Sequence, residues 1–316
     1  MSFKASAPGS MMLLGEYAVL HGKHALVCAV DKRMVVTITP RADDRICIHS
    51  ALMGDDSTNL AGLNQPLEKP FHFILAALKQ YQTRLRYGCD IDIVSDFSDK
   101  WGLGSSAAVT VATLSAVAAW LNVRVSLLEL VRQGRKVVRQ IQGVGSGADI
   151  AASVFGGMVA YQAEPLAVEK FSVVYPLTAV YAGFKTPTVA AIQQVNQRFA
   201  PYPCLFHKLC HGIDQCVLEG MELVRKQEWA KLGVVLNIQQ GLMDALGVNS
   251  PLMHALVLGL RKLPGVLGAK ISGSGLGDCV IGLGESTETA VFDCAEVGMH
   301  AIPVCMTLQG VYCEKI

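Results

Sequence analysis

Residues 99–112, DKWGLGSSAAVTVA, place two glycines and two serines directly before a long apolar run. The run from Ala107 to Leu121 has the composition of a buried helix. A helix N-terminus carries unpaired N–H groups and a partial positive charge, and glycines before it let an anion approach the backbone. The stretch therefore predicts a phosphate cradle or, alternatively, a glycine turn with a serine cap on a buried helix.

Two further glycine-rich stretches follow later in the chain. In QGVGSGADIAASVFGG, residues 142–157, Asp149 comes after three glycines and a serine and before an apolar helix. An aspartate in such a turn can accept the proton of a substrate hydroxyl during phosphoryl transfer, or it can act only as a helix cap. In KISGSGLGDCVIGLG, residues 270–284, a strand precedes a glycine loop. Taken alone, that loop is a flexible turn more often than a site.

Composition limits the classes of protein to which the chain can belong. Its 316 residues are 51% apolar and 17% charged, with a formal net charge of +1, which is typical of a well-cored globular protein. No basic run or acidic tail indicates a nucleic-acid or membrane partner. Ten scattered cysteines without a C-x-x-C pair and the absence of a signal peptide predict a cytoplasmic protein. Oligomeric state, including a homodimer, is left open by the sequence.

The order of the predicted elements indicates an α+β protein. Strand-like segments come early, and helices are interleaved without strict βαβ alternation, which favours two packed layers in each half. The join is expected near residues 165–180, between domains at 1–170 and 171–316. Helices are predicted at 69–84, 106–121, 126–143, 189–198, 208–226, 230–246 and 251–262. Strands are predicted at 34–40, 47–52, 89–97, 157–163, 170–177, 269–274, 278–284 and 303–313.

A resemblance to a known family extends across the chain. Three stretches in this order resemble the three motifs of the GHMP kinase superfamily: APGSMMLLGEYAVLHGKHALVCAVDKR at 7–33, GLGSSAA at 102–108 and GSGLGDC at 273–279. The resemblance implies an N-terminal domain like ribosomal protein S5 domain 2 and a ferredoxin-like C-terminal domain. It also implies that ATP, Mg²⁺ and a small-molecule substrate meet in the cleft between them.

The resemblance assigns roles to particular residues. Asp149 would orient or deprotonate the attacking oxygen, and Ser106 would be the Mg²⁺ ligand. The implied ATP-binding residues are Gly102, Leu103, Gly104, Ser105, Ser106, Ala107, Gly273 and Gly275. The implied substrate-binding residues are Glu16, Lys100, Ser146, Gly147 and Ser274. Two of these have alternatives: Glu16 could be a structural carboxylate paired with Lys23 or Arg33, and Lys100 could be a solvated lysine in a charged turn.

Within the family, three stretches favour one acceptor. KWGLGSSAAVTVA, QGVGSGADIAA and the Gly-Asp-Cys of the third motif are more similar to phosphomevalonate kinases than to mevalonate kinases. We therefore expect ATP-dependent phosphorylation of phosphomevalonate, with mevalonate as the alternative acceptor. A sugar kinase or a non-catalytic nucleotide sensor of the same fold is less favoured.

The chain departs from the family pattern at two positions. Ser10 stands where mevalonate and phosphomevalonate kinases usually carry a lysine near the transferred phosphate. Val138 stands eleven residues before Asp149, where mevalonate kinases carry a Mg²⁺-binding glutamate. Another cation is expected to replace the lysine, and the candidates are Lys4, Lys100 and Lys185.

Overall fold

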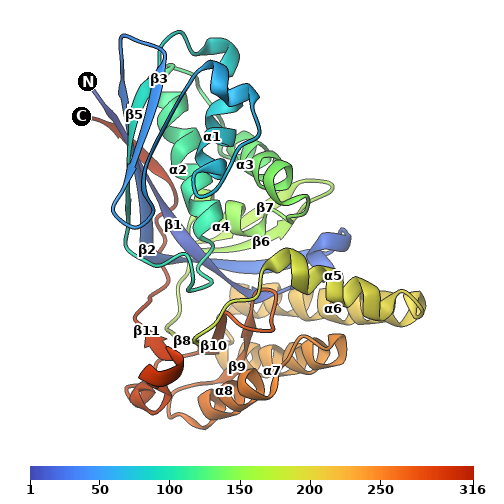
Figure 1. Cartoon of the computed structure of the whole chain (residues 1–316). Coiled ribbons are helices and arrows are strands. Elements are labelled where there is room, and N and C mark those ends of the chain that lie inside the picture. Colours follow the sequence, from blue (N-terminus) through green and yellow to red (C-terminus); the bar gives the residue numbers. More distant parts are fainter.

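A computed structural model describes all 316 residues as two sheets, each with helices packed against it (Figure 1). The larger sheet has eight strands, and the path through it runs β12-β1-β2-β5-β3-β4. Strands β6 and β7 continue the sheet from the first half of β2. The bounds are β1 (Phe3–Leu14), β2 (His24–Pro40), β3 (Arg45–Ser50), β4 (Gly54–Asn59), β5 (Cys89–Ser95), β6 (Met158–Gln162), β7 (Ala167–Phe171) and β12 (Tyr312–Lys315).

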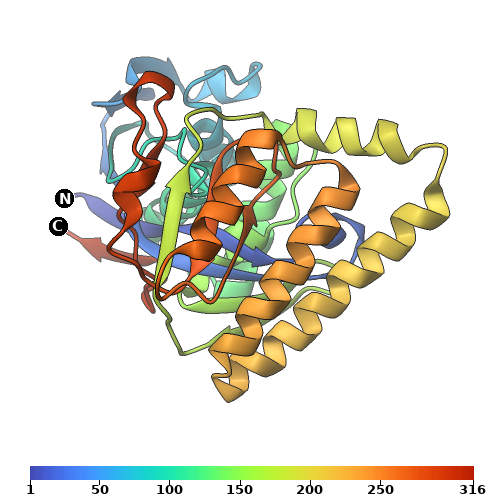
Figure 2. The same ribbon diagram turned by 90° about the horizontal axis from the view of Figure 1, so that it is seen from below.

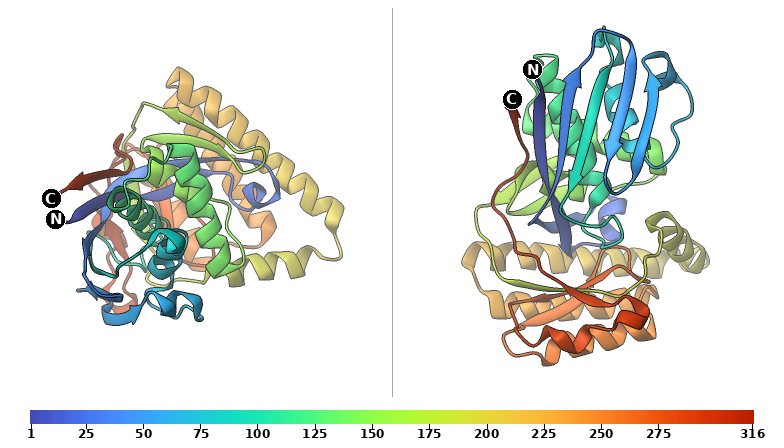
Figure 3. Two further views of the ribbon diagram at one scale, coloured as in Figure 1. Left: turned by 90° about the horizontal axis from the view of Figure 1, so that it is seen from above. Right: turned by 60° about the vertical axis from the view of Figure 1, so that its left-hand side comes forward.

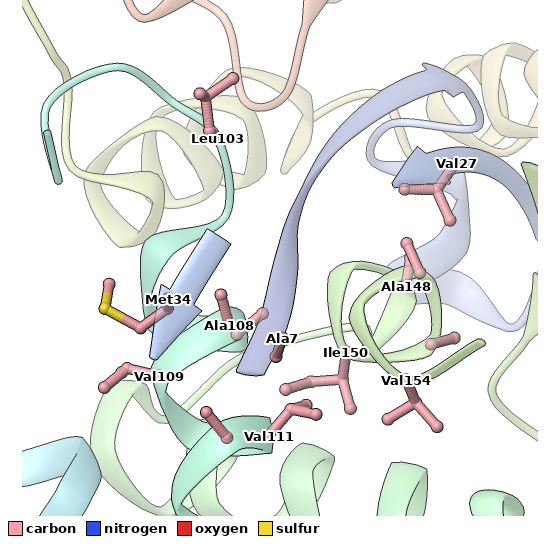
Figure 4. Close-up of a cluster of buried hydrophobic side chains, with 14 of the residues drawn as sticks. Ala7, Val27, Met34, Leu103, Ala108, Val109, Val111, Ala148, Ile150 and Val154 are labelled. Atoms are coloured by element: carbon pink, nitrogen blue, oxygen red, sulfur yellow. The ribbon is translucent and has the colours of Figure 1, made fainter. Parts of the chain in front are cut away.

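Four helices cover the larger sheet, and the second of them, α2 (Ser105–Trp120), is packed between the sheet and the other three helices. The other three are α1 (His72–Lys79), α3 (Leu127–Gln142) and α4 (Ala148–Phe155). Helix α2 is apolar on every side and mostly buried, as the sequence predicts. Ala7 of β1 lies between Ala108 of α2 and Ile150 of α4 (Figure 4). The small side chains of Ala7 and Ala108 let α2 pack closely on β1.

The smaller sheet has four antiparallel strands in the order β11-β8-β10-β9. Helices α7 and α8 pack on it, and α6 lies between α7 and the first two strands of the larger sheet (Figure 2). The bounds are β8 (Leu177–Tyr181), β9 (Gly268–Ser272), β10 (Cys279–Leu283), β11 (His300–Ile302), α5 (Thr188–Phe199), α6 (Pro203–Lys226), α7 (Trp229–Leu246) and α8 (Pro251–Lys262). Short 3₁₀ turns are η1 (Ala18–His21), η2 (Ala61–Asn64), η3 (Gln82–Arg84), η4 (Thr289–Phe292) and η5 (Ala295–Val297).

The predicted α+β class is confirmed, and the predicted organisation needs three corrections. The second domain does not extend to residue 316, because β12 pairs with β1 and both chain ends lie side by side (Figure 3). Residues 172–176 are not a strand and connect the two sheets. Most of the predicted strand at 303–313 is an extended connection that returns to the larger sheet. No helix is long and apolar enough to cross a membrane.

Candidate active site

The glycine loop before α2 forms the floor of the candidate site. Gly104 is the N-cap residue of α2, its φ of 65° is left-handed, and no side chain caps the helix. Ser105 and Ser106 are the first two residues of the helix and are half-buried. The serine-cap interpretation of this stretch is therefore wrong. Both hydroxyls remain free to bind a ligand at the positive end of a 16-residue helix.

Strand β1 supports this loop from below. The register of β1 against β2 shifts between Pro8 and Gly9, so the ladder is interrupted just before Ser10. The Ser10 N–H instead donates to the Leu103 carbonyl oxygen at 3.0 Å. A Cβ added at Gly104 would lie 2.3 Å from Ser10 Oγ. The loop thus packs so tightly on β1 that only glycine fits at position 104.

Asp149 lies in the same place, on the first turn of α4. Its Oδ1 accepts a hydrogen bond from Ser10 Oγ at 2.8 Å, and its Cβ is 3.6 Å from a Cβ built at Gly104. The N-cap of α4 is Gly147, so the interpretation of Asp149 as the cap is wrong. Burial raises the pKa of Asp149, whereas the Ser10 hydrogen bond and the nearby charge of Lys185 lower it. A carboxylate so placed can accept a proton from a bound hydroxyl.

A second aspartate touches the other glycine of the loop. A Cβ added at Gly102 would lie 3.0 Å from the Cβ of Asp278, which comes just before β10. Asp278 is 6% exposed, and its Oδ1 has no hydrogen-bond partner. Burial raises the pKa of Asp278 to about 6, and Lys185 opposes this shift. The glycine-rich stretch at residues 270–284 therefore contacts the glycine loop before α2.

Contacts from the end of β1 hold the third loop across the domain boundary. Glu16 is buried, forms an ion pair with Lys270, and accepts hydrogen bonds from Gln239 Nε2 and from the Gly273 N–H. The Tyr17 hydroxyl donates to the Ser274 carbonyl oxygen. The structure therefore supports the alternative interpretation of Glu16 as a structural carboxylate, but its partner is Lys270. The predicted partners are wrong, because Lys23 lies 3.9 Å from Asp214 and Arg33 donates to Ser6. Glu16 binds the protein's own glycine loop.

Some of the remaining predicted site residues contact other parts of the protein, and others have space or an unpartnered polar atom that a ligand could use. Ser146 Oγ accepts from the Ala148 N–H, and Gly147 packs against Tyr161 and Arg135, so both shape the turn before Asp149. Ala107 is buried under the loop. Around Gly273 there is open space, and the buried Ser274 Oγ has no partner. Gly275 packs on Val248.

The structure ranks the three candidate cations. Lys4 pairs with Glu314 at the edge of the larger sheet, far along β1 from Ser10. Lys100 is exposed and forms no ion pair. Lys185 lowers the pKa of both Asp149 and Asp278, and its Nζ donates to the Asp99 carbonyl oxygen at 2.8 Å. Lys185 is therefore the cation placed to act on both carboxylates.

The residues present fit Mg²⁺ held mainly by a nucleotide. No three His, Cys, Asp or Glu side chains form a metal cluster. Mg²⁺ in nucleotide sites commonly takes one or two protein oxygens and completes its shell with phosphate oxygens and water. Ser106 Oγ and the unpartnered oxygen of Asp278 are available for such a role. Val138 lies on the buried side of α3 and supplies no carboxylate.

Three important contacts were not predicted from the sequence. The bond between Ser10 and Asp149 joins residues 139 positions apart, and the pair of Glu16 and Lys270 joins residues 254 apart. Asp278 was singled out only as part of a Gly-Asp-Cys resemblance. A signal existed for Lys270 and Asp278, because both are charged residues in otherwise apolar or glycine-rich segments next to strands.

Comparisons with known proteins identify the family of the chain. The model of the GHMP kinases N terminal domain matches residues 72–157, and that of the GHMP kinases C terminal matches residues 221–297. A mevalonate kinase from Pyrococcus furiosus is 30% identical over 308 residues, which cover 92% of each chain.

Solved structures share the same fold over the whole chain. The Lin0012 protein from Listeria innocua superposes with a TM-score of 0.87 at 21% identity, covering 100% of both chains. A Streptococcus pneumoniae phosphomevalonate kinase in complex with phosphomevalonate and AMPPNP gives a TM-score of 0.76 at 19% identity, covering 99% of both chains. The family models, the relative and the fold together show that this chain belongs to the GHMP kinase family and is a kinase.

Proposed function

We propose that this kinase transfers the γ-phosphoryl group of ATP to phosphomevalonate, with mevalonate as the second candidate acceptor. One observation carries the catalytic part of the proposal. The half-buried Asp149 accepts a hydrogen bond from Ser10 directly beneath the glycine loop and beside the free N-terminus of α2. A proton acceptor and a phosphate-binding helix end therefore share one small space.

The chemistry follows from that geometry. The acceptor oxygen attacks the γ-phosphorus, the bond between that phosphorus and the bridging oxygen of the β-phosphate breaks, and ADP leaves. With phosphomevalonate the attacking atom is a phosphate oxygen, which passes to Asp149 any proton that it still carries, whereas with mevalonate the attacking hydroxyl loses its proton to Asp149. The backbone N–H groups of the loop and the hydroxyls of Ser105 and Ser106 would bind phosphate oxygens. When bound, Mg²⁺ neutralises charge on those oxygens. Ser106 would be one of its ligands.

A cavity beside α3 is our candidate for the site that binds the nucleoside part of ATP. It has a volume of about 380 Å³, and Leu67, Lys69, His72 and Ile141 are among its lining residues. Ile141 lies at the end of α3, and the turn that follows leads directly to Asp149. Apolar side chains can contact a base, and lysines can bind phosphate or ribose oxygens.

Two lysines near the glycine loop support phosphomevalonate as the acceptor. Lys100 comes two residues before Gly102, Lys185 Nζ donates to the carbonyl oxygen of Asp99, and neither lysine forms an ion pair with a carboxylate. An acceptor that carries a phosphate needs such a cation, whereas mevalonate lacks this phosphate. The context of the first glycine motif, with Lys100 and an aromatic residue before it, supports the same acceptor.

The named relative supports the second candidate. The Pyrococcus furiosus protein is a mevalonate kinase at 30% identity. The structural neighbours show the fold and do not distinguish the acceptors. The exposed position of Lys100 is also compatible with a solvated role.

A coupled ADP-release assay with phosphomevalonate, mevalonate and galactose tests the proposal. We expect phosphomevalonate to give the highest kcat/KM. In Lys100→Met, the KM for phosphomevalonate should rise about 10- to 150-fold, with a smaller change for ATP. A preference for mevalonate that Lys100→Met leaves unchanged would move the assignment to mevalonate kinase. ADP release with galactose alone would reject both acceptors.

A further inference from the structure

Two aspartates lie on opposite glycines of the same loop. Asp149 lies against Gly104 and Asp278 against Gly102, so the three-residue Gly-Leu-Gly segment separates the half-buried carboxylate of Asp149 from the buried carboxylate of Asp278. Asp149 comes from the N-terminal domain and is hydrogen-bonded to Ser10. Asp278 comes from the other sheet, and one of its carboxylate oxygens is unpartnered. The mechanism proposed above uses only the first of these two groups.

The backbone fixes Asp278 in this position. Its N–H donates to the Phe184 carbonyl oxygen and its carbonyl oxygen accepts from the Ala182 N–H, each at 2.9 Å. The next residue, Cys279, donates from Sγ to the Trp101 carbonyl oxygen at 2.7 Å. The segment before β10 is thereby held to the glycine loop of the other domain. The position of Asp278 is therefore set by structure on both sides of the boundary.

Asp278 has an unusual backbone conformation, and one of its buried carboxylate oxygens has no hydrogen-bond partner. Its φ of 64° is left-handed, which ordinary residues avoid and which recurs at functional sites. Lys185 does not form an ion pair with it, since its Nζ donates to the Asp99 carbonyl oxygen. Burying a carboxylate oxygen without a partner is unfavourable unless a ligand or cation completes the site. The unpartnered oxygen of Asp278 is therefore available to a bound ligand or cation.

A divalent cation is the partner that best fits this position. Mg²⁺ prefers carboxylate and hydroxyl oxygens and requires few protein ligands when phosphates are present. Helix α3 offers Val138 where the family pattern has a metal-binding glutamate, so a carboxylate from another element is needed. We propose that Asp278, which the smaller sheet of the C-terminal half places against Gly102, is the carboxylate that holds the divalent cation of the bound nucleotide. This inference rests on the proposed kinase function.

Binding of Mn²⁺ in the presence of saturating ADP tests the inference without an acceptor or turnover. Free Mn²⁺ is followed by electron paramagnetic resonance with the full chain. The variants are Asp278→Asn, which keeps the shape, and Asp278→Gly, which also removes the left-handed strain and so protects against misfolding. The control is Asp99→Asn, because that exposed carboxylate forms only a 3.5 Å contact with Ser98.

We expect both Asp278 variants to weaken Mn²⁺ binding about 10- to 150-fold, the range for one charge-assisted contact. Metal-free ADP should bind equally well or more tightly, because a negative charge beside the phosphates is gone. The control should match the wild type. Unchanged Mn²⁺ affinity, or an equal loss of metal-free ADP binding, would overturn the inference. A wild type that releases ADP in the coupled assay but shows no metal-dependent nucleotide binding would overturn the inference alone; failure of both would reject the proposed function.

Discussion

Two glycine loops meet at the domain boundary and differ in the residues at their strained positions. The first loop comprises residues 102–104 before α2, and the second comprises residues 273–278 before β10. In the loop before α2, Gly102 and Gly104 occupy the left-handed positions, at φ values of 66° and 65°. In the loop before β10, Leu276 and Asp278 are left-handed as well, at 59° and 64°. The first loop rests on β1 of its own domain, whereas the second depends on Glu16 and Tyr17 from the other domain. The first loop has glycines at the left-handed positions named above, whereas the second has a leucine and an aspartate there and is held by contacts across the domain boundary.

The largest effect is expected for the carboxylate that we assign to chemistry. Asp149→Asn keeps the size of the side chain and can still accept from Ser10, but it cannot take a proton. We expect kcat to fall about 10²- to 10⁴-fold with little change in ATP affinity. Steady-state kinetics with ATP and the preferred acceptor measure both values. A near-wild-type kcat would reduce Asp149 to a structural residue.

The support of the strained loop is expected to matter most for stability. Lys270→Met leaves the Glu16 carboxylate buried without its cation, which should cost about 3–5 kcal/mol of unfolding free energy. Lys270 is 0% exposed, so water cannot replace it. Adding Glu16→Gln should recover part of the loss. Denaturant unfolding measures each variant, and a loss below about 1 kcal/mol would show that the second loop does not depend on this pair.

Opposite substitutions in the two loops sharpen the contrast. Gly104→Ala forces a left-handed alanine against Ser10 and should lower stability by at least about 1–2 kcal/mol. Asp278→Gly removes both strain and a buried charge, and should raise stability by about 1–3 kcal/mol. Thermal unfolding of the metal-free chain compares the two. Destabilisation by Asp278→Gly would contradict the assignment of strain to the second loop.

The smallest effect concerns the pH dependence of the first loop. The Ser10 hydroxyl stabilises the charged form of Asp149 and so lowers its pKa. Without that bond, Ser10→Ala should raise this pKa further, and the base becomes protonated at a higher pH. The acid limb of kcat/KM should therefore move to higher pH. An acid limb that stays in place would show that Asp149 does not control it.

The sequence predicts local structure well and long-range contacts poorly. Three of the later helices, α5, α7 and α8, begin and end within one residue of the predicted bounds because their periodicity is local. Helix α6 begins five residues earlier than predicted, with Pro203 in its first turn. The capping of α3 by Ser126 is also confirmed. Which aspartate would lie against which glycine depends on packing between domains, and no local pattern encodes it.

Local sequence patterns also do not show which residues replace the lysine and the glutamate that are missing at Ser10 and Val138. Sequence motifs show that Ser10 and Val138 lack the expected functional groups, but they do not show where substitutes come from. Lys185 and Asp278 are 93 positions apart in the chain and become neighbours through the pairing of β8 with β10. The antiparallel register brings the residues after β8 alongside the residue before β10. Only the fold reveals that pairing.

The most direct test of the division of labour between the two loops is metal rescue of single-turnover phosphoryl transfer. Asp149→Asn and Asp278→Asn are compared while Mg²⁺ is raised from limiting to saturating concentration. The account predicts that Asp278→Asn recovers most of the wild-type rate at high Mg²⁺, because only metal binding is weakened. Asp149→Asn should stay slow at every concentration, because its proton acceptor is missing. Rescue of Asp149→Asn by metal, or a deficit in Asp278→Asn that Mg²⁺ does not change, would contradict the account.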